Sequence, residues 1–196
     1  MISPNDVPED SESAVETVPP DHVVLVRYGV VPQVARFGLS SEIRQQLASL
    51  QRHGLNIVVD SDRGLEVAQL LEIVTTDIHS DKPVTGDVVR VATADDVHQH
   101  SANRRRAELE FFDWQQRADR WQLQLQIIDA EWTLDEKQIV LYVLNDQNAE
   151  TTRLALLAAA AGLGVIHVQP VSVEGVVRET SGGGCGSGGC GSGGCS

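Results

Sequence analysis

The sequence predicts an α+β protein, with a small antiparallel, barrel-like N-terminal sheet followed by a helix–strand–strand–helix–strand layer. Two patterns predict this fold. The first half contains runs rich in Val, Leu and Ile separated by glycine-containing turns, whereas the second half alternates helical and strand periodicity. Apolar residues make up 41% of the 196 residues, an ordinary fraction for a globular protein that can form a core.

In the first half, residues 22–29 are expected to form a strand, followed by a short strand around Gln33–Phe37. Ser40 is placed to cap a helix that Gly54 would end. Two more strand-like runs flank the sequence Asp62-Arg63-Gly64, where glycine supplies a turn that needs positive φ. The apolar residues at helical spacing after Ser40 are Ile43, Leu47 and Leu50.

The second half begins with a polar connection over residues 77–88. Thr93 precedes Asp96 by three positions, a capping-box pattern that predicts the start of a long helix. The single face expected along that helix has a polar upper half and an aromatic lower half that packs, and it comprises Val97, His100, Arg104, Ala107, Phe111, Trp114, Ala118 and Trp121. The elements expected after it are a strand over 122–133 with a bulge at Ile127-Ile128, a turn over 134–137, a strand at Gln138–Leu144, a helix at Ala149–Ala161 closed by Gly162 or Gly164, and a strand at Val165–Val168.

Composition divides the chain into three parts. Residues 1–21 are expected to be a disordered acidic lead, residues 22–178 the α+β domain with subparts 22–91 and 92–178, and residues 179–196 a flexible Gly/Ser/Cys-rich tail. The net charge of −13 argues against tight binding of nucleic acids, whose partners usually carry a positive field. We expect a cytoplasmic protein, because the first 21 residues lack a signal-peptide pattern and the longest apolar run is too short for a membrane span.

No catalytic constellation is recognisable, so we expect a protein that is not an enzyme and has no catalytic residues. The six histidines are scattered over different elements, and no nucleophile elbow, phosphate-binding loop or zincin motif occurs. Arg104-Arg105-Arg106 is the only dense basic patch. Since Glu108 and Glu110 follow at once, a solvated helix with internal ion pairs is favoured over a phosphate-binding surface.

The three cysteines lie together in the tail, at Cys185, Cys190 and Cys195, with glycine on the N-terminal and C-terminal side of the first two. Glycine lets a chain wrap tightly enough for thiolates to converge on one metal centre. The residues therefore indicate a candidate metal site, for an iron–sulfur cluster if any cofactor is bound. The alternative is a flexible linker in which the cysteines have no shared role, because zinc sites favour closer spacing.

Several motifs, read in order, resemble the RicT/YaaT family of bacterial proteins with a polymerase-suppressor-type C-terminal domain. The resemblance covers roughly residues 22–190. Its motifs are Asp62-Arg63-Gly64-Leu65-Glu66, Ala92-Thr93 with Asp96, Asp129-Ala130-Glu131-Trp132 with Asp135, Tyr142, and the spacing of Cys185 and Cys190.

The resemblance implies a non-catalytic cytoplasmic adaptor that joins small helical proteins of the RicA/RicF type. Together these proteins would bind an iron–sulfur cluster and influence RNA processing by ribonuclease Y. The chain departs from the family pattern at Gly191, where the family has a cysteine adjacent to the one at Cys190, and at Ala68, where the family has glycine. It also departs at residues 165–170, a strand that usually contains arginine. The helix expected at Ser40–Gly54 is also atypical. A metal or redox module formed by the tail, and a weak RNA-binding domain, remain the alternatives.

Overall fold

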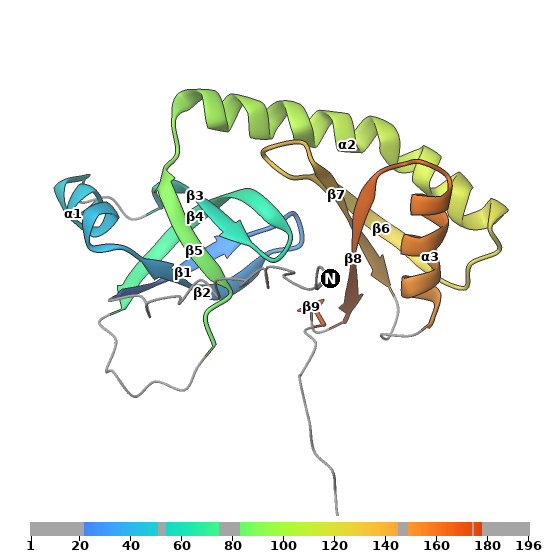
Figure 1. Ribbon diagram of the computed structural model, residues 1–196, viewed down its shortest axis with the longest axis horizontal. Helices are drawn as coiled ribbons and strands as arrows, with labels where there is room; N and C mark the ends of the chain where they lie inside the picture. Colours follow the sequence, from blue (N-terminus) through green and yellow to red (C-terminus); the bar gives the residue numbers. More distant parts are fainter. Residues whose placement is uncertain (1–21, 51–53, 75–82, 145–148, 174, 178–196) are drawn as a thin grey trace, which may run out of the picture. The chain divides into compact units, whose positions relative to one another are not determined.

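The computed structural model describes residues 22–50, 54–74, 83–144, 149–173 and 175–177. They divide into two compact units. The first unit contains the described residues up to Tyr28 and those of 34–97, and the second contains residues 29–33 and those from His98 onward. The mixed helix and strand content confirms the predicted α+β class, with a barrel first and a layer of helices and strands after it (Figure 1).

The first unit is a closed five-stranded barrel in the order β1-β2-β5-β3-β4. Buried side chains from all five strands form one core that includes Val24, Phe37 and Ile57, all fully enclosed. The strands are β1 (His22–Tyr28), β2 (Gln33–Leu39), β3 (Asn56–Ser61), β4 (Gly64–Val74) and β5 (Gly86–Val91). Closure gives each described strand of this sheet a neighbour on both sides.

Helix α1 (Ser41–Leu50) follows β2, as the capping pattern predicts. The Ser40 hydroxyl accepts a hydrogen bond from the Ile43 amide at 3.3 Å, so it satisfies one of the amides left free at a helix start. Leu47 and Ile43 pack against the barrel core, whereas Leu50 is exposed. The helix therefore covers part of the barrel with its apolar face.

Strand β5 was not expected, because Gly86 and Asp87 fell within the predicted polar connection. Gly86 lies so close to β3 that an added Cβ would be 1.9 Å from the Asp60 carbonyl oxygen. The barrel is also not wholly antiparallel: β5 pairs with β3 in the antiparallel sense but with β2 in parallel, through Phe37–Gly86 and Gly38–Asp87. The prediction of an antiparallel barrel is therefore wrong for this one pair.

The second unit contains a four-stranded sheet in the order β6-β7-β8-β9, with helices α2 and α3 (Figure 1). Its elements are α2 (Ala94–Arg120, whose first residues lie in the first unit), β6 (Gln126–Trp132), β7 (Gln138–Leu144), α3 (Ala149–Ala160), β8 (Val165–Ser172) and β9 (Gly175–Val176). The predicted slip in β6 is confirmed, since its register with β7 shifts between Ile127 and Asp129. Strands β7 and β8 are parallel, whereas β6 and β7 are antiparallel.

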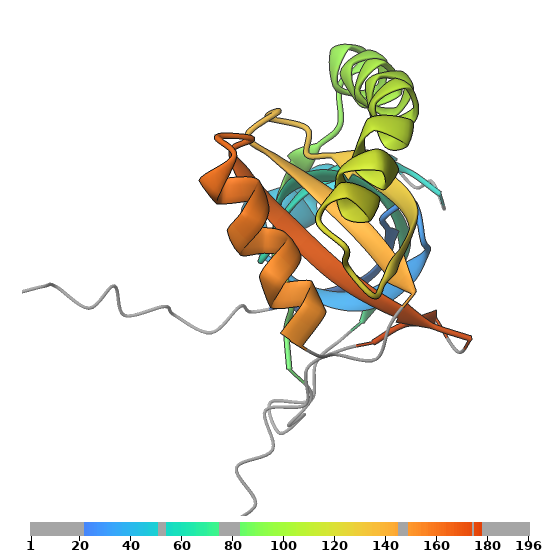
Figure 2. The same cartoon turned by 90° about the vertical axis from the view of Figure 1, so that its right-hand side faces the viewer.

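One face of this sheet carries the helices. Ile139, Leu141 and Val143 of β7 form a core with side chains of α2 and α3, including Trp114 and Leu154. Figure 2 shows α3 running alongside β8. Because a parallel β7–β8 connection must return the chain to the same end of the sheet, α3 fills the role of a crossover helix.

The opposite face of the sheet is covered by the turn between β1 and β2. Val30 and Val31, which belong to the second unit, pack against Val140 and Tyr142 of β7 and against Val171 of β8. Strand β7 is consequently buried on both faces, and all its residues from Ile139 to Val143 are enclosed. Within the described residues, no helix combines the length and apolar character needed to cross a membrane.

Candidate functional site

The predicted metal ligands Cys185, Cys190 and Cys195 lie outside the described residues. In the part of the chain that the structure describes, no group of three or more His, Cys, Asp or Glu side chains is arranged to hold a metal ion. The candidate site is therefore sought among the polar motifs that carry the family resemblance and on the exposed surface beside them.

The first motif, Asp62-Arg63-Gly64-Leu65-Glu66, forms the tight β3–β4 turn and an enclosed ion pair. The Arg63 Nε donates to Glu66 Oε1 at 3.0 Å, and the two side chains are only 2% and 4% exposed. The Ser61 hydroxyl donates to the same carboxylate at 2.7 Å, and the Arg63 guanidinium lies 4.9 Å from the centre of the Tyr28 ring. Gly64 has φ of 109°, as the turn prediction requires. The contacts of this motif therefore stabilise the interior of the barrel.

The second motif is a complete reciprocal capping box at the start of α2, and it confirms the prediction. The Asp96 amide donates to the Thr93 hydroxyl at 3.2 Å, and the Thr93 amide donates to Asp96 Oδ2 at 2.7 Å. Arg90 of β5 donates to the other carboxylate oxygen at 2.8 Å. The hydrogen bond from Arg90, together with those from Thr93, holds the pKa of Asp96 well below its usual range. The motif joins β5 to the helix start.

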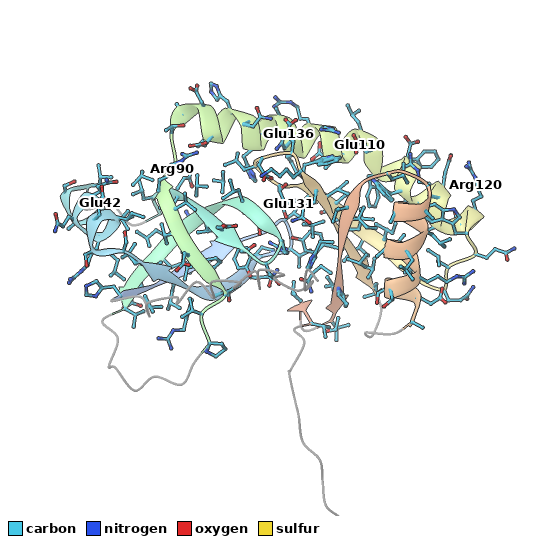
Figure 3. The ribbon with its side chains drawn as sticks, in the orientation of Figure 1. Glu42, Arg90, Glu110, Arg120, Glu131 and Glu136 are labelled. Atoms are coloured by element: carbon cyan, nitrogen blue, oxygen red, sulfur yellow. The ribbon has the colours of Figure 1, made fainter. Side chains whose placement is uncertain are left out.

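The third motif, Asp129-Ala130-Glu131-Trp132, contributes two separate contacts within the second unit. The Asp129 carboxylate accepts a hydrogen bond from Arg104 at 2.8 Å, and this bond raises the pKa of the arginine. Glu131 points to the opposite side and is buried, where it accepts from the Tyr142 hydroxyl at 2.8 Å and from the Val30 amide at 3.0 Å. Glu131 thus fixes the turn between β1 and β2 on the sheet (Figure 3).

The arginine patch is largely neutralised from within, as expected for a helix with internal ion pairs. Arg104 pairs with Glu108 at 3.0 Å, and Arg106 pairs with Glu110 at 2.9 Å, each four residues further along α2. Arg106 also lies 3.9 Å from the centre of the Trp132 ring, whose indole nitrogen donates to Glu110. Figure 3 labels Glu110 on α2 and Glu136 in the turn between β6 and β7.

Sequence reasoning missed Asn103, which is 2% exposed in the middle of α2. Its side-chain nitrogen donates to the Thr133 carbonyl at 2.8 Å, and its oxygen accepts from Gln99 at 2.9 Å. An Asn inside a helix usually faces solvent. The only sequence signal that could have indicated burial is its position directly before Arg104, in the charged part of the predicted face. It anchors the helix to the end of β6.

An open hollow of about 320 Å³ lies in the first unit beside the start of α2. Small and uncharged residues line it: Gly54, Leu55, Asn56, Ala92, Thr93, Ala94 and Val97. The polar groups of Thr93 are already engaged in the capping box. The hollow consequently offers a ligand no charged group.

The outer face of α2 carries apolar side chains that nothing in the described chain covers. Leu109 is 82% exposed and Phe112 is 64% exposed, one helical turn apart. Arg105 is exposed one turn before Leu109 and, among the described residues, forms no ion pair. Two large apolar side chains beside a charge that no described residue pairs with are typical of a protein-binding surface. This surface is the candidate functional site.

Comparison with protein-family models gives a match to the middle of the chain. A family model described as the PSP1 C-terminal conserved region matches residues 86–155. The matched segment runs from β5 to α3, and includes the capping box, the Asp129–Trp132 motif, Tyr142 and the α2 surface. No curated protein and no solved structure gives a significant match.

The match confirms the resemblance drawn from the motifs for the segment that it covers, while residues 22–85 and 156–190 lie outside it. Three of the motifs that carried the resemblance fall inside the matched segment, and the structure assigns each of them a contact that holds the fold together. Residues 86–155 are thus similar to the PSP1 C-terminal conserved region, the domain found in proteins of the RicT/YaaT type.

Proposed function

We propose that this chain is a non-catalytic cytoplasmic adaptor, which acts in a protein complex that influences RNA processing by a ribonuclease. The proposal rests on the PSP1 region over residues 86–155 and on the function that the RicT/YaaT resemblance implies. By the same resemblance, its partners are small helical proteins and ribonuclease Y.

The pairing of the charged residues supports a non-catalytic role. Arg63 and Glu66, Arg90 and Asp96, and Arg104 and Asp129 are engaged with one another in pairs rather than gathered around a cavity. Groups paired in this way maintain a fold, and a general acid or base would have to give up its partner to act. Arg105, Leu109 and Phe112 instead lie on the surface, where a protein partner can reach them.

Affinity purification from cells that naturally encode the chain tests the proposal. The tagged full-length chain should co-purify with a ribonuclease, and deletion of its gene should change the maturation pattern of specific transcripts. A parallel purification from cells that express the tag without the chain is the control for unspecific capture. If no ribonuclease co-purifies with the chain and the transcript ends are unchanged in the deletion strain, the adaptor role is excluded.

The alternative function is a metal or iron–sulfur module formed by Cys185, Cys190 and Cys195. The observation that favours it is the even spacing of all three cysteines within one glycine-rich segment. Cuboidal clusters usually take four thiolates, so the fourth ligand would come from another molecule. Anaerobic reconstitution of the full chain should then give bound iron and broad visible absorbance. Replacement of the three cysteines by serine should abolish both, and a wild-type chain free of iron and zinc would exclude the site.

A further inference from the structure

The exposed face of α2 has the spacing of a coiled-coil seam. Exposed residues recur along the helix at alternating steps of three and four, which is the heptad pattern through which two helices pack. Leu109 and Phe112 occupy the centre of the series. Its members, which we call the α2 seam, are Ala102, Arg105, Leu109, Phe112, Gln116 and Asp119.

The α2 seam matches itself when a second copy runs antiparallel. A twofold axis midway between Leu109 and Phe112 places Leu109 of each copy against Phe112 of the other, so each apolar side chain meets an apolar one. The same axis places Arg105 opposite Gln116, whose amide oxygen can accept its hydrogen bonds. Ala102 is too small to clash with Asp119 at the ends of the contact.

Charges beside the seam agree with this arrangement. Arg106 and Asp113 each directly follow a seam residue, Arg105 and Phe112, and so occupy the same position of the heptad. In an antiparallel pair, residues at this flanking position face one another across the axis, which brings Arg106 of one copy toward Asp113 of the other. Asp113 is exposed, and the Arg106 side chain is 45% exposed although it already pairs with Glu110. The contact occurs twice by symmetry, and it joins opposite charges each time.

We infer that the α2 seam is a homodimer interface, at which a second copy of this chain docks antiparallel through Leu109 and Phe112. The four apolar side chains give the contact a small hydrophobic centre, and the surrounding polar residues favour the antiparallel orientation of the two helices. An interface of this size is typical of weak, reversible association rather than of an obligate dimer. Dimer formation should therefore depend on protein concentration in the micromolar range or above, on the order of 10⁻⁶ M.

Sedimentation equilibrium of the full-length chain tests the inference. Cys185, Cys190 and Cys195 are replaced by serine in every sample, so that neither disulfides nor metal can join two copies. The starting protein should show a monomer–dimer equilibrium, and Leu109→Asp should raise the dissociation constant by at least about tenfold, because a carboxylate would be buried among apolar groups. Leu156→Asp is the matched control: Leu156 is 66% exposed on α3, and its replacement should leave the equilibrium unchanged.

A second substitution tests the antiparallel register. Gln116→Glu places a carboxylate opposite Arg105 of the other copy, twice per dimer, and should lower the dissociation constant by between about twofold and tenfold. In an Arg105→Ala background the same substitution should have no such effect. A parallel pair would keep Arg105 and Gln116 apart, so tightening by Gln116→Glu identifies the antiparallel arrangement.

Three outcomes would overturn the inference. The chain could remain monomeric at every concentration, it could dimerise with the same constant after Leu109→Asp, or Gln116→Glu could fail to strengthen the dimer. A monomeric chain whose Leu109→Asp variant loses a different protein in pull-down experiments would assign the seam to that partner instead. Melting curves of each variant confirm that it is folded before its association is measured.

Discussion

Arg63 and Glu66 form an ion pair within the barrel that is almost wholly removed from water, with side-chain exposures of 2% and 4%. Two charges are stable there because each finds further polar or π contacts: Ser61 donates to the carboxylate, and the Tyr28 ring lies under the guanidinium. Loss of one partner would leave the other charge buried without compensation.

Glu66→Ala should therefore lower the free energy of unfolding by about 3–5 kcal/mol. Chemical denaturation monitored by circular dichroism measures the change. Lys137→Ala is the control, because Lys137 is 80% exposed in its pair with Asp135 and such surface pairs contribute about 0–1 kcal/mol. Equal losses for the two variants would show that the enclosed pair contributes no more than a surface pair.

The capping box predicts a pH-dependent contribution to stability. The hydrogen bond from Arg90, with those from Thr93, lowers the pKa of Asp96 below its ordinary value of 3.8. A lowered pKa means that the carboxylate stabilises the folded state above pH 3.8, and that this contribution disappears as the pH falls toward the lower folded-state value. Melting temperatures of the starting protein and Asp96→Asn should differ near neutral pH and converge in acid.

Thr93→Ala separates the capping contribution from the ion pair. It removes the hydroxyl that accepts from the Asp96 amide and donates to Asp96 Oδ2, but it leaves the contact with Arg90. It should therefore cost about 0.5–2 kcal/mol near neutral pH, and less in acid where the carboxylate is protonated. A difference between the starting protein and Asp96→Asn that stays constant into strong acid would contradict the assigned pKa shift.

The contact between Glu131 and Tyr142 predicts the protection of one particular amide. Tyr142→Phe removes a hydrogen bond to a buried carboxylate and should destabilise the second unit by about 1.5–3 kcal/mol. Glu131→Gln keeps an oxygen that can accept from the Val30 amide, whereas Glu131→Ala does not. Hydrogen exchange should be faster at Val30 in Glu131→Ala than in Glu131→Gln, and equal rates would show that the carboxylate does not hold the turn.

The cysteine-bearing tail should be dispensable for folding. Truncation after Thr180 removes a segment dominated by Gly and Ser, which has little apolar surface to bury. The described strands end at Val176, before the truncation point. The melting temperature and secondary-structure content should stay nearly unchanged, as measured by circular dichroism. Loss of cooperative unfolding in the truncated chain would show that the tail packs against the rest.

Affinity for single-stranded RNA should be weaker than micromolar at physiological salt, the range of non-specific binding. The net charge is −13, and the two outer arginines of the basic patch are already paired with Glu108 and Glu110. Fluorescence anisotropy with a labelled single strand measures the affinity. Tight binding that resists salt would instead support the RNA-binding alternative.

The elements that local pattern determines were predictable from the sequence. Strand β7 was predicted with its observed bounds, and both Ser40 and Thr93 start the helices that their spacing indicated. These signals lie within a few residues of the element that they define, and they depend on periodicity and on backbone amides that need a partner.

Contacts that depend on distant segments were not predictable in this way. The side-chain pattern of a strand does not encode the direction of its neighbour, so the parallel pairs β2–β5 and β7–β8 were missed. Asn103 finds its partner Thr133 thirty residues away. Of the candidate site, Arg105 was predicted as part of a solvated patch, but the exposure of Leu109 and Phe112 required the structure, because an apolar residue on a helix is expected to face a core.

The turn at residues 29–33 has a consequence for how this protein can change in evolution. Because this turn, with Gln33 at the start of β2, belongs to the second unit while β1 and the rest of β2 belong to the first, neither unit is encoded by one uninterrupted stretch of the gene. A recombination event near codon 98 would deliver the second unit without Val30 and Val31, and would expose the face of the sheet that they cover. The two units are therefore expected to be inherited together, and not exchanged singly between proteins as cassettes.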